Sequence, residues 1–210
     1  IGAGTTTITA TQEASGNYIG GSVTGSLVVS PIAPTIGTLT APAKNYGDAS
    51  FNLTTPTSNS SGAFTYTSSA PGVATVTSSG GVVTVVGAGT TTITATQAAS
   101  ADGNYTGGSF VTASLVVSPI APTIGTLTAP AKNYGDASFN LTAPTSNSNG
   151  AFTYTSSAPG VATVTSSGGV VTIVGAGTTT ITATQAASAN GNYTGGSSVT
   201  ASLEIGRAHV

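Results

Sequence analysis

Few side chains of this 210-residue sequence could carry out covalent chemistry, and they lie far apart in the chain. A Ser or Thr nucleophile needs a base beside it, and the only histidine is His209, next to the last residue. Asp48 and Asp136 each follow a lysine by four residues, so we expect them to pair with Lys44 and Lys132 if they form ion pairs. The sequence therefore predicts a protein that is not an enzyme, with no catalytic residues.

One short segment resembles part of a calcium-binding loop. Asp102, Gly103 and Asn104 offer a carboxylate and an amide oxygen, which are ligands that Ca²⁺ prefers. A later copy of the segment reads Asn190-Gly191-Asn192 and lacks the carboxylate. We therefore expect a turn capped by its own Asp or Asn side chain, with no metal ligand and no cofactor. The absence of cysteine excludes disulfides and thiolate metal sites.

Aromatic side chains could instead bind a sugar by stacking. The candidates are Tyr46, Tyr66, Tyr105 and Phe110. Tyr66 alternates in register with Phe64, so it is better explained as a core residue. Tyr105 could fold back onto the domain as readily as face a ligand. Ser198 replaces Phe110 in the copy, so that ring is not required in every module. Binding of a glycan or a cell-surface receptor through the loops stays open.

The low charge of the chain limits its partners. Three Lys and Arg residues stand against five Asp and Glu residues, whereas proteins that bind nucleic acids need clustered positive charge. No apolar run approaches the roughly 18 residues that a membrane-spanning helix requires. We therefore expect no nucleic acid partner and no membrane span, and we expect neighbouring repeats of the same chain to be the main partners.

A long internal repeat organises the elements that hold these residues. Pro31–Leu115 matches Pro119–Leu203 at an offset of 88 residues, with five differences. This period is too long for a solenoid and suits a small domain with its own core. We predict a C-terminal remnant of a repeat at 1–30, with its last two strands, a complete repeat at 31–118 and a complete or nearly complete repeat at 119–205.

The most constant stretch within the repeat reads Gly-Ala-Gly-Thr-Thr-Thr-Ile-Thr-Ala-Thr-Gln and occurs without change at 2–12, 87–97 and 175–185. β-branched residues at period two indicate a half-buried strand. In the middle copy this pattern places Thr91, Ile93, Ala95 and Gln97 on one face, and Thr90, Thr92, Thr94 and Thr96 on the other. The threonine row resembles an ice-binding array, but a single row per domain is better explained as a solvated strand face.

The rest of the repeat follows the same alternation, interrupted by turn residues. Strands are expected at 35–39, 50–54, 63–68, 73–77, 82–86, 87–97 and 109–117, with turns at 44–48 and 78–81. In the last strand Val111, Ala113, Leu115 and Val117 should point inward, and Phe110 and Val116 outward. Seven short strands of this kind predict an all-β fold of tandem immunoglobulin-like β-sandwich domains.

Two motifs resemble a known family. The segment Ser-Ser-Ala-Pro-Gly-Val-Ala-Thr-Val (68–76), followed by Val-Val-Gly-Ala-Gly-Thr-Thr-Thr-Ile-Thr-Ala-Thr (85–96), resembles the bacterial Ig-like domains of invasin/intimin type. The Lys-Asn-Tyr-Gly-Asp turn at 44–48 and 132–136 is similar to turns in repeats of large bacterial surface proteins. The resemblance covers the chain to about Leu203 and implies tandem extracellular modules with structural or adhesive roles. It carries no catalytic residues.

The end of the chain departs from the repeat. Residues 204–210 can be back-translated into a stretch that resembles a common sequencing-library adapter, so we expect a non-native tail on a truncated reading frame. The favoured function is a structural spacer of a large bacterial cell-surface or secreted protein. An adhesin module that binds a glycan or partner surface is one alternative, and the accessory domains of a secreted enzyme are another.

Overall fold

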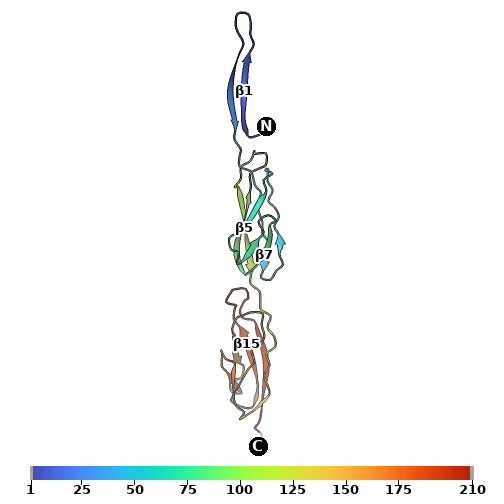
Figure 1. Cartoon of the computed structure of the whole chain (residues 1–210). Coiled ribbons are helices and arrows are strands. Elements are labelled where there is room, and N and C mark those ends of the chain that lie inside the picture. The colour runs from blue at the N-terminus through green and yellow to red at the C-terminus, as the bar shows by residue number, and fades with distance from the viewer. Residues whose placement is uncertain (1, 209–210) are drawn as a thin grey trace. The chain divides into compact units, whose positions relative to one another are not determined.

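A computed structural model describes residues 2–208, and within that range every regular element is a β-strand (Figure 1). The same range contains no helix with the length and apolar character needed to cross a membrane. The first two strands, β1 (Gly4–Gln12) and β2 (Gly21–Val29), form an antiparallel hairpin that is a separate two-stranded sheet. The expected tail ends in His209 and Val210, which lie outside the described residues.

Each complete copy of the repeat forms seven strands in two sheets. The first copy contains β3 (Lys44–Asn45), β4 (Phe51–Asn52), β5 (Phe64–Ser68), β6 (Ala74–Val76), β7 (Val82–Val85), β8 (Gly89–Gln97) and β9 (Phe110–Ser118). The second contains β10 (Lys132–Asn133), β11 (Phe139–Asn140), β12 (Phe152–Ser156), β13 (Ala162–Val164), β14 (Val170–Ile173), β15 (Gly177–Gln185) and β16 (Ser198–Gly206).

The strand order is the same in both copies. One sheet has the order β3-β9-β8-β5 in the first copy and β10-β16-β15-β12 in the second. The other sheet has the order β4-β7-β6 and β11-β14-β13. Two sheets of four and three short strands are the arrangement of an immunoglobulin-like sandwich, so the predicted fold class is confirmed.

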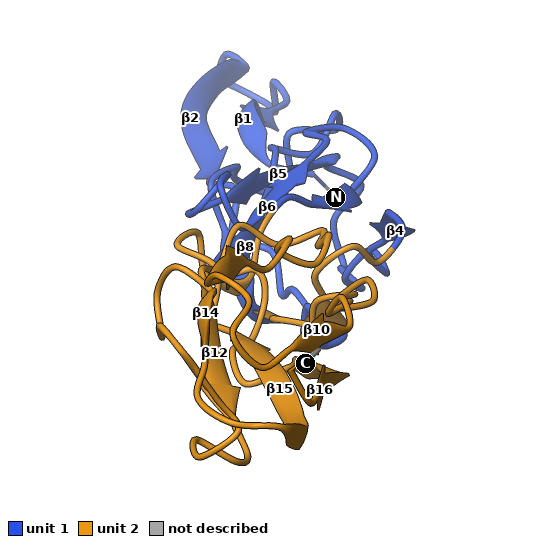
Figure 2. Cartoon of the chain, turned by 90° about the horizontal axis from the view of Figure 1, so that it is seen from below, with its two compact units in different colours: residues 1–43, 49–86, 90–116 blue, residues 44–48, 87–89, 117–210 orange. Residues whose placement is uncertain are grey.

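The chain divides into two compact units (Figure 2). Unit 1 contains residues 1–43, 49–86 and 90–116, and unit 2 contains residues 44–48, 87–89 and 117–210. Unit 2 therefore includes two turns of the first copy, 44–48 and 87–89, together with the whole second copy.

The core of the second copy takes buried side chains from strands of both its sheets. Tyr154, Ile181 and Leu203 come from the four-stranded sheet, and Ala162 and Val171 come from the three-stranded sheet. Full burial of a single Ile or Leu side chain contributes about 1.5–3 kcal/mol. The corresponding residues of the first copy are buried as well: Tyr66, Ala74, Val83, Ile93 and Leu115.

The predicted alternation along the most constant strand is confirmed. Thr91, Ile93, Ala95 and Gln97 of β8 are all buried, and the four threonines between them are half-buried or exposed. The last strand follows its prediction too, because Leu115 and Val117 are buried and Val111 and Ala113 half-buried. On its other face Phe110 is 63% exposed and Val116 is 45% exposed.

A glutamine at the end of this strand fixes a loop from inside the domain. The Gln97 side-chain Nε2 donates to the carbonyl oxygens of Gly62 (2.8 Å) and Ser60 (3.1 Å). Its Oε1 accepts from the hydroxyl of Ser58 (2.7 Å). All the side-chain polar groups of this buried residue are therefore paired, which avoids the cost of burying an unsatisfied amide. Gln185 makes the same three contacts in the second copy.

The predicted strand at Thr35–Leu39 is wrong. This segment forms a single isolated bridge, between Ile36 and Ser58, although Leu39 is buried at 6% exposure. Pro34 and Pro42 flank the segment and have no backbone N–H to donate to a ladder. The segment therefore contributes its side chain to the core without regular strand pairing.

The first strand of each copy is instead a pair of residues in the predicted turn. Lys44 and Asn45 form β3, which lies parallel to Val117 and Ser118 at the end of β9. The amide N–H of Tyr46 extends this pairing by donating to the carbonyl of Ser118 (2.9 Å). The same pairing joins β10 to Ile205 and Gly206 in the second copy. Residues 204–206, expected in the tail, thus continue β16.

Candidate functional site

The loop between β8 and β9 holds the calcium-like segment, and its polar groups are directed inward. The Ser100 hydroxyl and the Asn104 backbone N–H (3.0 Å) both donate to Oδ1 of Asp102. The Asn104 side-chain Nδ2 donates to Oδ2 of the same carboxylate (2.8 Å). The hydrogen bond from Ser100, followed by those from Asn104, holds the pKa of Asp102 below its usual value. The carboxylate thus caps its own turn.

The second copy builds the same loop without a carboxylate. Asn190 Oδ1 accepts from the Ser188 hydroxyl (2.7 Å) and from the Asn192 backbone N–H (3.2 Å). The Ser188 hydroxyl oxygen in turn accepts from the Tyr193 N–H (2.9 Å), as Ser100 does from Tyr105 in the first copy. A neutral amide reproduces the contacts that shape the loop, so the loop is built around a capping oxygen. Residues 2–208 contain no group of three or more His, Cys, Asp or Glu side chains placed to hold a metal ion.

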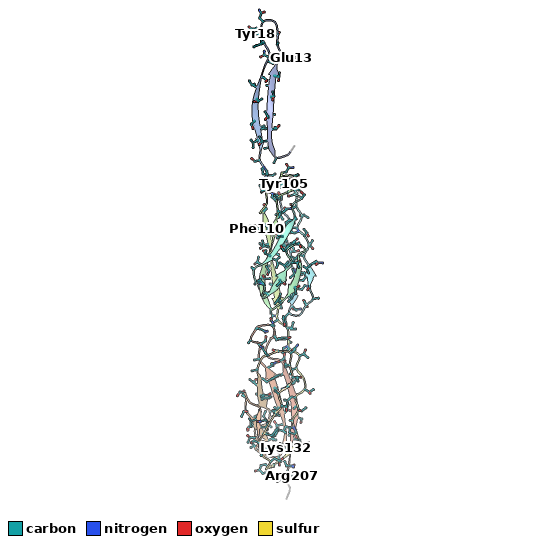
Figure 3. All side chains as sticks on the ribbon, in the orientation of Figure 1. Glu13, Tyr18, Tyr105, Phe110, Lys132 and Arg207 are labelled. Atoms are coloured by element: carbon teal, nitrogen blue, oxygen red, sulfur yellow. The ribbon has the colours of Figure 1, made fainter. Side chains whose placement is uncertain are left out.

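The aromatic residues proposed for sugar stacking are not on one surface. Tyr66 is 4% exposed in the core. Its counterpart Tyr154 is also buried, which raises the pKa of that hydroxyl above its usual value of about 10. Phe110 projects from β9 and is exposed (Figure 3). The Tyr46 ring lies against the edge of Tyr193, with centroids 5.5 Å apart and planes at 78°.

The aspartates of the Tyr-Gly-Asp turns also cap their own backbone. Oδ2 of Asp48 accepts from the Asn45 N–H (2.9 Å), and Oδ2 of Asp136 accepts from the Asn133 N–H (2.9 Å). The ammonium group of Lys132 lies 5.3 Å from the centroid of the Phe139 ring. The two aspartates therefore stabilise the backbone of their own turns.

Two asparagines make contacts that sequence reasoning missed. Oδ1 of Asn104 accepts from the backbone N–H of Ala3 (2.6 Å) within unit 1. Oδ1 of Asn192 accepts from the backbone N–H of Ala88 (2.7 Å) within unit 2. Both alanines are the middle residue of the Gly-Ala-Gly turn, and both asparagines lie in a Gly-Asn-Tyr segment. The recurrence of both segments with the repeat is the feature of the sequence that could have indicated this contact.

Comparison with protein-family models gives one match in each copy. The model of the bacterial Ig-like domain (group 2) matches residues 51–106. The model of the intimin immunoglobulin-like domain matches residues 140–187. Each complete copy therefore contains a segment that matches bacterial Ig-like domains. This confirms the resemblance to the invasin/intimin type.

Solved structures with a similar chain trace are multidomain proteins. Mouse Cadherin-23 EC22-24 is 15% identical, with a TM-score of 0.36, and the match covers 97% of this chain and 74% of that one. The match to Protocadherin Gamma B2 extracellular cadherin domains 3-6 has 17% identity and a TM-score of 0.36. It covers 91% of this chain and 56% of that one. The match to the surface layer protein SbsC, domains 1-6, has 15% identity and a TM-score of 0.32. It covers 100% of this chain and 36% of that one. A search of curated proteins finds no match.

Bacterial Ig-like domains are typically extracellular or surface modules with structural or adhesive roles, and they are typically non-catalytic. In this chain the polar loop residues cap turns, and the asparagine oxygens hold neighbouring turns. The contacts that recur from copy to copy therefore join parts of the chain to one another.

Proposed function

We propose that the chain is a non-catalytic spacer array from a large bacterial cell-surface or secreted protein. Its modules occupy residues 31–118 and 119–205, and residues 1–30 are the end of a preceding module. The function of each module is to stay folded while the chain that runs through it is pulled from both ends.

The parallel pairing of the first and last strands carries this proposal. Lys44 and Asn45 run in the same direction as Val117 and Ser118. Tension applied at the two ends of the module pulls these strands in opposite directions along their length. The hydrogen bonds between them are then loaded together, in shear, whereas an antiparallel pair pulled at its open end would lose them one by one. Lys132 and Asn133 with β16 repeat the arrangement.

Single-molecule pulling of the whole chain tests the proposal. Two unfolding events are expected, each releasing close to the roughly 300 Å that 88 residues span when extended, less the folded length. Tyr46→Pro removes the N–H that donates to Ser118 and should lower the force of one event. The second copy is the internal control. Tyr46→Ala loses the same ring but keeps the N–H, so the force of that event should stay above its value in Tyr46→Pro. Two equal events in Tyr46→Pro would refute the role of this pairing.

Adhesion through the loops is tested on the same protein. A glycan array probed with the full chain should show no specific binding if the modules act as spacers. A reproducible hit that is lost in Phe110→Ser would instead favour the adhesin function, because Phe110 is exposed in the first copy and absent from the second.

A further inference from the structure

The same loop-to-turn contact occurs twice along the chain. In each case a Gly-Asn-Tyr segment, 103–105 or 191–193, supplies the side-chain oxygen, and a Gly-Ala-Gly turn, 2–4 or 87–89, supplies the N–H. We call the Gly-Asn-Tyr segment the docking loop. The turn belongs to the copy that precedes the docking loop in the sequence. The repeat itself therefore encodes both sides of the contact.

Hydrogen bonds to neighbouring residues fix the backbone of the docking loop. The backbone of Ile120 brackets Asn192 and Tyr193, because its N–H donates to the Asn192 carbonyl (3.1 Å) and its carbonyl accepts from Thr194 (2.9 Å). Ile32 holds the docking loop of the first copy in the same way. In that copy the Asn104 Nδ2 is bound to Asp102 (2.8 Å), which leaves Oδ1 to face the turn.

In unit 2 the side that receives the docking loop consists of the Gly-Ala-Gly turn and a nearby tyrosine. In unit 2 the Ala88 N–H meets Asn192, and the Tyr46 ring meets Tyr193. We call the combination of Tyr46 with 87–89 the acceptor surface because it receives the docking loop. In the hydrogen bond itself the Ala88 N–H is the donor. Gly87 is buried there and Ala88 is half-buried, and Asn192 is only 8% exposed.

The second copy presents the same acceptor surface in an open state. Tyr134 and the turn 175–177 stand 88 residues after Tyr46 and 87–89. Tyr134 is 52% exposed and Ala176 is exposed. An open hollow of about 390 Å³ is lined by Tyr134, Val174, Gly175, Ala176, Arg207 and Ala208. Lys132 and Arg207 both lie at this end of the copy (Figure 3), where Gly206 pairs with Asn133.

We propose that this open acceptor surface, Tyr134 with 175–177, binds the docking loop of a further repeat of the same sequence. The asparagine oxygen of the added docking loop accepts a hydrogen bond from the Ala176 N–H, and the tyrosine of that loop packs its edge against Tyr134. A neutral amide suits the position because it accepts a hydrogen bond without the desolvation cost of a carboxylate. The proposal rests on the spacer function and deepens it, since it makes each joint between modules a specific contact.

Backbone hydrogen exchange of the full chain, followed residue by residue by NMR, tests the pairing that is already formed. The Ala3 and Ala88 amides should exchange about tenfold more slowly than the Ala176 amide, which has no docking loop. Asn192→Ala should speed the exchange of the Ala88 amide and leave the exchange of the Ala3 amide slow. Asn104→Ala should speed the exchange of Ala3 and leave that of Ala88 slow. Asn192→Asp keeps an acceptor oxygen at the desolvation cost of a carboxylate, so Ala88 should exchange more slowly than in Asn192→Ala, which separates loss of the contact from loss of the loop fold. Equal exchange at Ala88 and Ala176 in the unaltered chain would overturn the proposal.

A chain extended by one repeat tests the open surface. Residues 204–210 are replaced by a second copy of 116–205, which restores the junction sequence of the first copy and adds a docking loop. Slowing of Ala176 exchange by about tenfold is expected, and alanine at the added position equivalent to Asn192 should abolish it. No slowing in the extended chain would refute the docking proposal. The spacer function would survive that result if each module still unfolded separately at unchanged force under load.

Discussion

The nine residues Gly-Thr-Thr-Thr-Ile-Thr-Ala-Thr-Gln form a strand in the N-terminal hairpin and again in each complete copy, but with opposite burial. In β1 every one of the nine residues is exposed. In β8 and β15 every second residue is buried. The central isoleucine shows the contrast most clearly, because Ile8 is 57% exposed whereas Ile93 and Ile181 are fully buried.

The pairing of this strand with its neighbour does not account for the contrast. Thr7 lies opposite Ser26 in the hairpin, and the equivalent Thr180 lies opposite Ser202 in the second copy. The register is therefore the same in both places. What the hairpin lacks is the second sheet that covers the inward face. Local sequence thus determines the strand and its register, and burial depends on strands that lie earlier in the repeat.

The largest difference is expected when the central isoleucine is truncated. Ile181→Ala leaves a cavity in the core of the second copy and should lower its free energy of unfolding by about 2–5 kcal/mol. Ile8→Ala removes an exposed side chain and should change stability by less than about 0.5 kcal/mol. Residue-resolved hydrogen exchange at increasing urea separates the two copies and the hairpin. Similar losses for both variants would mean that the hairpin face is covered in solution.

A smaller difference is expected at the last residue of the strand. Gln185→Leu leaves the carbonyls of Ser148 and Gly150 and the hydroxyl of Ser146 without their partner, which should cost about 1–3 kcal/mol. Gln12 is exposed, so Gln12→Leu should have almost no effect. Exchange at the Gly150 N–H reports whether the loop has loosened. An unchanged rate there would show that the three contacts do not hold the loop.

The contrast also explains which features could be predicted from the sequence. The alternation of Thr91, Ile93, Ala95 and Gln97 predicts a strand and its inward face, because both depend on residues that are adjacent in sequence. The exposed Phe110 follows from the same alternation. These local patterns were sufficient for the fold class and for six of the seven strands in the first complete copy, β4 to β9.

Features that depend on a single contact between distant residues could not be predicted. β3 is two residues long and pairs with Val117 and Ser118, more than 70 positions away, so it has no periodicity of its own. The bond from Ala88 to Asn192 joins residues 104 positions apart through one side-chain oxygen. A strand was predicted at 35–39, but that segment forms only an isolated bridge between Ile36 and Ser58, although Leu39 reaches the core. In each case the decisive property is tertiary.

The smallest difference concerns the loop that follows the shared strand. The first copy has Asp102 there and the second has Asn190, whereas the hairpin connects Gln12 to Gly21 with a shorter loop. Because hydrogen bonds from Ser100 and Asn104 lower the pKa of Asp102 in the folded state, the ionised carboxylate stabilises this loop above the unfolded pKa of about 3.9. That contribution is lost as the pH falls through the lower, folded pKa.

Acidification should therefore loosen the loop of the first copy and leave that of the second copy unchanged. NMR chemical shifts of the Asn104 and Asn192 amides between pH 6 and pH 2 measure this directly. The Asn104 amide should titrate with Asp102, and the Asn192 amide should not follow it. Asp102→Asn converts the first loop to the sequence of the second and should abolish the titration. If Asn104 still titrated in that variant, another acidic group would be responsible, and the capping role of the carboxylate would be wrong.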